Sequence, residues 1–315
     1  VKVQSKASDP TASEAEGTVW YNTATTALKY SIESAGAWAS APALNTARNS
    51  QGSAGDSVSA MLINGGNPSP GMITEIYNGT AWSEGADAST NRQEFGSSWC
   101  GTSTATLMAT GGPLTTATEE FNGTAWSAET AAPTAGRGSS GAGTTTAMVI
   151  AGGYAPGTTT ASFEYDGSTW TTTGALGTGR AWPGGGGSQT AAINAGGAPA
   201  APAGDKTETY NGSTWTEVAA MNTKKDGPGM SGGQGAQGFA LCFGGQTPPT
   251  TAATEQWDGT SWTEVGDLAT ARRLPGSGGP NGTAALCIGG NTPPPATTLV
   301  EEFSTPNAIK TFTAS

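Results

Sequence analysis

Short apolar runs alternate with stretches of small and polar residues along most of the chain. A representative segment, residues 148–170, begins with MVIAGG, passes through a loop of Pro, Gly and Thr, and ends with SFEYDGSTW. Short apolar runs bounded by glycine and turn residues are typical of β-strands. An Asp-Gly dipeptide favours a two-residue hairpin turn, because both of its central residues need positive φ. The segment therefore predicts strands joined by tight turns.

The same pattern returns along the chain in a nearly fixed register. Glycine pairs stand at residues 65–66, 111–112, 152–153, 196–197, 244–245 and 289–290. Tryptophans spaced 44, 44, 44, 45 and 47 residues apart follow at Trp38, Trp82, Trp126, Trp170, Trp215 and Trp262. A period near 45 residues is typical of a propeller or a solenoid.

Each unit contains four parts that read as short strands. A basic residue opens a run of small residues, an apolar strand ends in the glycine pair, a loop rich in Pro and Thr follows, and an aromatic strand turns through Asn-Gly or Asp-Gly to the tryptophan. Four short strands per repeat make one propeller blade. We expect glycine and small residues near the central axis and the tryptophans between neighbouring sheets.

These features resemble Kelch-type repeats: the glycine pair after an apolar strand, an aromatic residue about a dozen positions later, the tryptophan five residues beyond it, and the basic residue before the first strand. The resemblance covers residues 39–303 and implies an all-β fold, a Kelch-like β-propeller with six four-stranded blades. A seventh blade stays possible.

Three regions are expected. Residues 1–36 form an N-terminal arm and β-hairpin, residues 37–305 form the propeller, and residues 306–315 form a C-terminal closing strand. The C-terminal strand completes the sixth blade, or the strand around Trp38 does so as a clasp between the chain ends, or the N-terminal hairpin belongs to a reduced seventh blade.

The N-terminal hairpin carries a second resemblance. Its sequence, GTVWYNTATTALKYSIESAGAW, is similar to a short module of bacteriophage tail and fibre proteins, and the repeats, rich in Ala, Gly and Thr and free of His, look like Kelch-like proteins of marine phages. The resemblance implies a virion protein whose N-terminal arm binds other virion proteins, with homo-oligomerisation possible.

Charge and composition exclude several functions. The net charge is −11, with 13 basic and 24 acidic residues, which argues against nucleic acid as a partner because phosphates need a basic face. No apolar run approaches the ~20 residues that span a bilayer, so no membrane insertion is expected. The chain contains no histidine, which removes the usual general base and the commonest metal ligand. We expect no enzymatic activity, no cofactor and no metal.

The basic residues are candidate ligand-binding groups. The arginines all fall where repeats begin, and Lys225 with Lys224 fills the fifth slot. In a propeller they would form a ring near one mouth of the channel. The ring would bind phosphate or carboxylate groups, or each cation would bond backbone carbonyls or a Glu of the neighbouring blade. The members proposed for binding are Arg48, Arg92, Arg137, Arg180, Lys225 and Arg272.

Three aromatic residues outside the regular tryptophan series are further candidates. Trp99 and Trp182 follow shortly after Arg92 and Arg180, and Tyr154 lies in one of the variable Pro- and Thr-rich loops. A rigid scaffold with variable loops is the usual layout of a recognition surface, and exposed aromatic rings stack on sugars. Packing in the core is the alternative role for these rings.

The sequence therefore predicts a non-enzymatic virion structural protein of a phage tail or fibre, located in the virion, whose loop face recognises a host surface glycan or protein. A secreted bacterial adhesin or interaction scaffold is one alternative. A polysaccharide-degrading propeller enzyme that works without His is the other.

Overall fold

The computed structural model describes residues 3–10, 18–33, 35–67, 71–97, 99–199, 201–233, 235–292, 295–305 and 307–312. In these ranges all regular elements are β-strands and no helix occurs, so the prediction of an all-β fold is confirmed. The chain divides into two compact units. The smaller unit comprises Val1–Ala37 and Ser304–Ser315, and the larger unit comprises Trp38–Phe303.

The smaller unit contains one four-stranded sheet in the order β1-β2-β3-β29. Its strands are β1 (Gln4–Lys6), β2 (Val19–Asn22), β3 (Ala27–Glu33) and β29 (Asn307–Thr311). The predicted hairpin is present as antiparallel β2 and β3, whereas β1 runs parallel to β2. The C-terminal segment contributes β29, which pairs with β3. Both ends of the chain thus meet in this small sheet.

The larger unit contains six sheets, named here the first to the sixth sheet in chain order. The first sheet comprises β5 (Gly52–Ser57), β6 (Ala60–Asn64), β7 (Thr74–Tyr77) and β8 (Trp82–Glu84). The second comprises β10 (Trp99–Thr102), β11 (Ala105–Ala109), β12 (Thr118–Phe121) and β13 (Trp126–Glu129). The third comprises β14 (Ser139–Thr144), β15 (Ala147–Ala151), β16 (Ser162–Tyr165) and β17 (Trp170–Thr172), with the short β9 (Gly96–Ser97) added beside β14.

The remaining three sheets repeat the plan. The fourth comprises β18 (Gly184–Ser188), β19 (Ala191–Ala195), β20 (Thr207–Tyr210) and β21 (Trp215–Val218). The fifth comprises β22 (Gly229–Met230), β23 (Ala240–Phe243), β24 (Thr254–Trp257) and β25 (Trp262–Glu264). The sixth comprises β26 (Gly276–Asn281), β27 (Ala284–Ile288), β28 (Val300–Ser304) and β4 (Ala37–Ala41). The strand around Trp38 therefore supplies the fourth strand of the last sheet.

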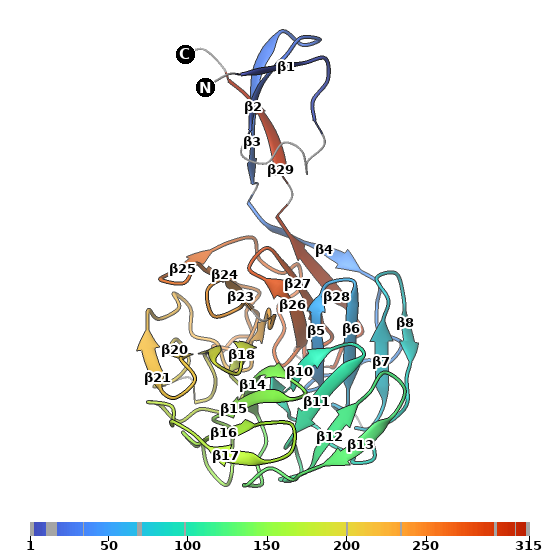
Figure 1. Ribbon diagram of the computed structural model, residues 1–315, viewed down its shortest axis with the longest axis vertical. Helices are drawn as coiled ribbons and strands as arrows, with labels where there is room; N and C mark the ends of the chain where they lie inside the picture. The colour runs from blue at the N-terminus through green and yellow to red at the C-terminus, as the bar shows by residue number, and fades with distance from the viewer. Residues whose placement is uncertain are drawn as a thin grey trace. The chain divides into compact units, whose positions relative to one another are not determined.

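The first strands of the six sheets succeed one another within the larger unit. Strand β5 contacts β10, β10 contacts β14, β14 contacts β18, β18 contacts β22, β22 contacts β26, and β26 contacts β5 again. Figure 1 shows these sheets arranged around a common centre with their later strands further out. Repeated four-stranded antiparallel sheets in this succession are compatible with the blades of a β-propeller.

Small residues line the space between the first strands. A cavity of about 140 Å³ lies there, with Ser53, Gly101, Gly141 and Gly185 among its wall residues. Glycine and serine suit this position because the backbones of several strands approach one another closely.

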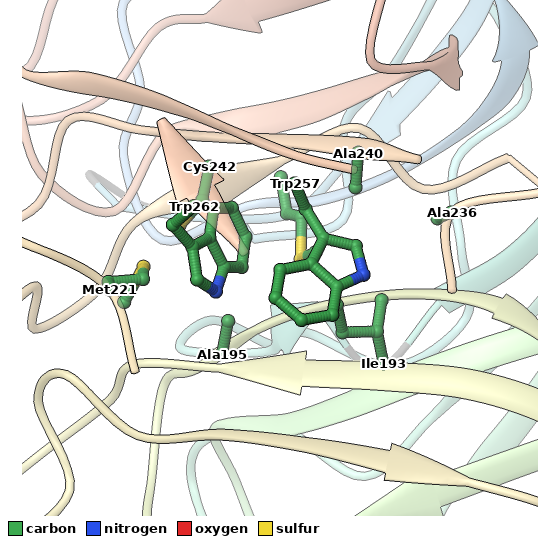
Figure 2. Packing of buried hydrophobic residues seen from close by; sticks show 9 residues of the cluster. Ile193, Ala195, Met221, Ala236, Ala240, Cys242, Trp257 and Trp262 are labelled. Atoms are coloured by element: carbon green, nitrogen blue, oxygen red, sulfur yellow. The ribbon is translucent and has the colours of Figure 1, made fainter. Parts of the chain in front are cut away.

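The recurrent tryptophans fill the space between neighbouring sheets. Figure 2 shows Trp257 and Trp262 of the fifth sheet against Ile193 and Ala195 of the fourth. The indole N–H of Trp262 donates to Thr207 Oγ1 of the fourth sheet at 3.0 Å. Equivalent bonds join other neighbouring sheets, Trp126 to Thr74 and Trp38 to Thr254. Each of these tryptophans thus contributes both apolar contact and a directional bond between sheets.

Candidate functional site

Five of the basic residues proposed for binding are buried in ion pairs within their own sheets. The pairs are Arg48–Glu75, Arg92–Glu119, Arg180–Glu208, Lys225–Glu255 and Arg272–Glu301. All five cations are at most 2% exposed. The carboxylate comes from the same sheet and not from a neighbouring sheet, and each cation is surrounded by protein acceptors. We therefore look for a ligand site at the basic residue that lies outside this set, Arg137.

Arg180 illustrates the geometry of these pairs. Its Nη2 lies 2.6 Å from Glu208 Oε1, and its Nη1 donates to the carbonyls of Gly196 at 3.2 Å and Lys206 at 2.8 Å. Glu208 also accepts the N–H of Gly177 at 2.6 Å. Burial lowers the pKa of Arg180 and the charge of Glu208 opposes that shift. A guanidinium stays protonated even so, and the pair ties the start of the sheet to its third strand.

The third sheet departs from this arrangement. In the other sheets the backbone carbonyl of the buried cation accepts an N–H from the glycine pair of the preceding sheet, as Arg180 O does from Gly153. The equivalent acceptor in the third sheet is the carbonyl of Gly136, which accepts the N–H of Gly111. Phe163 occupies the carboxylate position, since it pairs with Ile150 as Glu75 pairs with Ile63.

Arg137 is therefore one residue beyond the buried position, and it has different partners. Its Nη1 lies 2.5 Å from Glu94 Oε2, and the two side chains are 32% and 31% exposed. The guanidinium carbon lies 5.0 Å from the ring centre of Tyr154 and 5.8 Å from that of Trp182. These distances place the cation within cation–π range of both rings.

Tyr154 and Trp182 form the aromatic part of the site. Their ring centroids are 6.4 Å apart and their planes differ by 21°. Both side chains are partly exposed. Gly138 makes the packing of Trp182 possible, since a Cβ at Gly138 would lie 2.8 Å from the indole nitrogen. The structure thus brings together three of the residues singled out in the sequence, Arg137, Tyr154 and Trp182, and adds Glu94.

The backbone around Trp182 follows a pattern common to all six sheets. The residue two positions beyond the buried slot has positive φ in each: Ser50, Glu94, Gly138, Trp182, Gly227 and Leu274. Several consecutive members are joined by backbone bonds, for example Gly138 N to Glu94 O at 2.7 Å and Trp182 N to Gly138 O at 2.6 Å. A repeated backbone position therefore presents a different side chain in each sheet.

A cavity of about 180 Å³ lies beside this cluster in the third sheet. Its walls include Thr110, Gly136, Ser139, Gly152, Tyr154 and Phe163. The cavity occupies the position that the buried cation takes in the other sheets, because Gly136 and Phe163 both line it. Apolar and polar groups both line it, with Phe163 among the apolar residues and Thr110 and Ser139 among the polar ones.

Other predicted groups fall elsewhere. The side chain of Trp99 lies outside the described residues, although its backbone begins β10.

Burial raises the pKa values of Cys242 and Cys287 to about 12, so these thiols are packing groups. Across the described ranges, no cluster of three or more metal-ligating side chains is found. Nor does that part of the chain hold a helix long and apolar enough to cross a membrane.

The signal for the altered third sheet was present in the sequence. Five units place Glu two residues before the aromatic residue, as in Glu75 and Tyr77, whereas the third unit places Glu164 directly before Tyr165. That shift marks the loss of the carboxylate position. Glu94 carried no such signal, because its contact with Arg137 joins two different repeats.

No protein-family model matches this chain, and a comparison with curated proteins finds no match. The resemblances to Kelch repeats and to phage tail proteins therefore rest on the residues that carry them.

Proposed function

We propose that the larger unit is a closed, six-bladed Kelch-like β-propeller. The cyclic contacts of the first strands, from β5 round to β26 and back to β5, support closure. The use of β4 as the last strand of the sixth sheet supports it further, since a strand from the chain start then closes the sheet at the chain end.

We propose that this propeller is a recognition module without enzymatic activity, and that its ligand is a glycan or protein on a host cell surface. The observation that carries the proposal is the partly exposed cluster of Arg137, Glu94, Tyr154 and Trp182 beside the cavity of the third sheet. Aromatic faces stack on the apolar faces of sugar rings. The ion pair adds strong donors and acceptors for hydroxyl groups.

The smaller unit is proposed as the attachment element to other proteins of a virion tail or fibre. Val19 and Tyr21 alternate with buried Trp20 and Asn22 along β2, so that one face of the strand carries exposed apolar side chains. Phe312 is 50% exposed and packs against Tyr30 at a centroid distance of 4.5 Å. Exposed apolar side chains gathered on one small sheet favour a protein partner, either another virion protein or a second copy of this chain.

Binding to host cells and to a glycan array tests the recognition role. The informative variant is Trp182→Gly, because glycine stands at the same repeat position in the third and fifth sheets, at Gly138 and Gly227. We expect this variant to lose binding at least about tenfold, the loss typical of removing an aromatic anchor. Arg137→Ala should act in the same direction.

The matched control is Arg273→Ala. Arg273 occupies the same repeat position as Arg137, because its backbone forms a β-bridge with Asn291 as that of Arg137 does with Tyr154. The guanidinium of Arg273, however, donates to the side-chain oxygen of Gln246. Unchanged binding by the Trp182 and Arg137 variants would refute the proposed site. Cleavage of a bound polysaccharide would instead favour an enzyme, and host binding by a free secreted form would favour an adhesin.

A further inference from the structure

The third sheet retains the acceptors of the buried cation but not the cation. In four sheets the arginine Nη1 donates to two backbone carbonyls, as Arg48 does to Gly65 at 3.3 Å and Ile73 at 2.9 Å. Gly65 N bonds Ile73 O, and the equivalent bond of the third sheet is Gly152 N to Ala161 O. The carbonyls of Gly152 and Ala161 are therefore the matching acceptors.

Nothing in the backbone requires glycine at position 136. Gly136 is absent from the glycines with positive φ among the described residues. A Cβ added there would meet no atom closer than Tyr154 O at 3.7 Å. The missing side chain thus leaves space, and the space is the cavity of about 180 Å³. A single water needs only about 10–15 Å³ of such volume, so the cavity accommodates a group of several atoms.

One residue of the cavity wall carries a buried hydroxyl without a partner. Thr110 lines the cavity, is 2% exposed, and its Oγ1 forms no hydrogen bond within the described part of the chain. An unpaired buried hydroxyl is costly unless a ligand or water satisfies it. Ser139 Oγ donates to Gly152 O at 3.2 Å, which replaces one of the two bonds that the arginine makes in the other sheets. Ala161 O accepts Gly152 N and lacks the second donor that the arginine supplies there.

The charge of the cavity decides what kind of group fits. Phe163 replaces the carboxylate that neutralises the cation in the other sheets. Two acidic groups adjacent in sequence or in contact with the wall segments have other partners, Glu94 with Arg137 and Glu164 with the hydroxyl of Tyr210. A cation buried here would lack a counter-charge, which is strongly unfavourable. The cavity therefore suits an uncharged group with one N–H donor, one acceptor and an apolar end.

We propose that the cavity binds the acetamido group of an N-acetylated amino sugar. The amide N–H would donate to the Ala161 carbonyl, the amide oxygen would accept from Thr110 Oγ1, and the methyl group would contact the ring of Phe163. Tyr154 lies at the cavity wall and beside Trp182. A sugar ring attached to the bound acetamido group would therefore lie next to both aromatic rings. This inference rests on the proposed recognition of glycans and names the sugar class.

Ligand-observed NMR titrations of the full chain test the proposal. N-acetylglucosamine should bind at least about tenfold more tightly than glucose or glucosamine, because only the acetamido group fills the donor and acceptor positions. Two small probes isolate the cavity: N-propylacetamide should bind, whereas propylguanidinium, similar in size but charged, should not.

Two variants locate the binding. Thr110→Val removes the hydroxyl and keeps the shape, and we expect acetamide binding to fall about five- to tenfold. Gly136→Arg with Phe163→Glu restores the ion pair of the other sheets and fills the cavity, so acetamide binding should be lost. Phe163→Glu alone should reverse the preference in favour of propylguanidinium. Arg273→Ala is the control that should bind as the unaltered protein does.

The outcomes separate this inference from the proposed function. Equal binding of N-acetylglucosamine and glucose, or a preference of the unaltered protein for propylguanidinium, would overturn the acetamido site. If host binding still depends on Trp182 in that case, recognition stands and only the sugar class is wrong. Acetamide binding that responds to the Thr110 variant, in a protein without host affinity, would uphold the cavity and refute host recognition.

Discussion

The fourth and third sheets of the larger unit share a strand plan and a register, and they differ in how they use the same position. In the fourth sheet Arg180 and Glu208 are buried together against two backbone carbonyls. In the third sheet Gly136 and Phe163 leave a cavity at that position, and the cation has moved one residue to Arg137 at the surface. One sheet fills the position with a buried ion pair, and the other leaves a cavity there, which we propose as a ligand site.

In a repeated scaffold, residues with a specific function are expected where one repeat differs from the others. A feature present in every sheet is constrained by the packing that all sheets share. Where the side chains of one sheet differ from those of the others although the backbone keeps the same register, the shared packing does not explain the difference. Here the departure coincides with the stacked rings of Tyr154 and Trp182, and Tyr154 lies in the wall of the cavity.

The largest effect is expected from breaking a buried pair. Glu208→Gln leaves the Arg180 guanidinium buried without its counter-charge, and we expect the free energy of unfolding to fall by about 3–5 kcal/mol. Urea denaturation measures it. Glu217→Gln is the control, because Glu217 pairs with Lys206 but is 53% exposed, and should cost about 0–1 kcal/mol. Equal losses in the two variants would remove the distinction between buried and surface pairs.

Introducing the pair into the third sheet gives the next effect. Gly136→Arg and Phe163→Glu each place one uncompensated charge in the cavity, whereas the double variant places both. We expect a coupling of about 1–3 kcal/mol between the two changes in a double-mutant cycle of unfolding free energies. Additive effects would mean that the cavity is not the counterpart of the Arg180 site.

A smaller effect on stability is expected at Arg137. Its side chain and that of Glu94 are about one-third exposed, so solvent screens the pair and Arg137→Ala should lower the unfolding free energy by only about 0–1 kcal/mol. Arg180→Ala in the same measurement should cost about 3–5 kcal/mol. A loss at Arg137 as large as that at Arg180 would assign it a structural role and weaken its assignment to the ligand site.

The smallest effect concerns pH and the hairpin turns. Hydrogen bonds from Thr169 and neighbouring groups lower the pKa of Asp166, and bonds from Thr260 and its neighbours lower that of Asp258 to about 2. Because both pKa values are depressed in the folded state, their stabilising effect is complete above the ordinary value of 3.8 and is lost as pH falls below it.

Asparagine fills the same turn position in other sheets and does not titrate. Asp166→Asn should therefore flatten the pH dependence of the unfolding midpoint below about pH 4, and Asn122→Asp should steepen it. An unchanged pH profile in both variants would show that these turn bonds do not persist in solution.

Much of the architecture followed from the spacing of a few residue types. The glycine pairs and the tryptophan series placed the strands, because backbone with positive φ after each apolar strand and packing between sheets need those residues at fixed positions. The candidate site followed only in part. Arg137, Tyr154 and Trp182 were singled out, but Arg137 was grouped with five arginine and lysine residues that the fold buries. Glu94 could not be predicted, because its contact with Arg137 depends on how neighbouring sheets meet.

The repeat, the strand pattern and the absence of histidine could be read from the sequence alone, since they are properties of residue identity and spacing. Which basic residues are buried and which face solvent depends on how the chain folds. Burial of a charge depends on whether a carboxylate some 27 to 30 residues away arrives at the same place, as Glu75 does for Arg48 and Glu255 for Lys225. In the third sheet Phe163 arrives instead, and the position becomes a cavity.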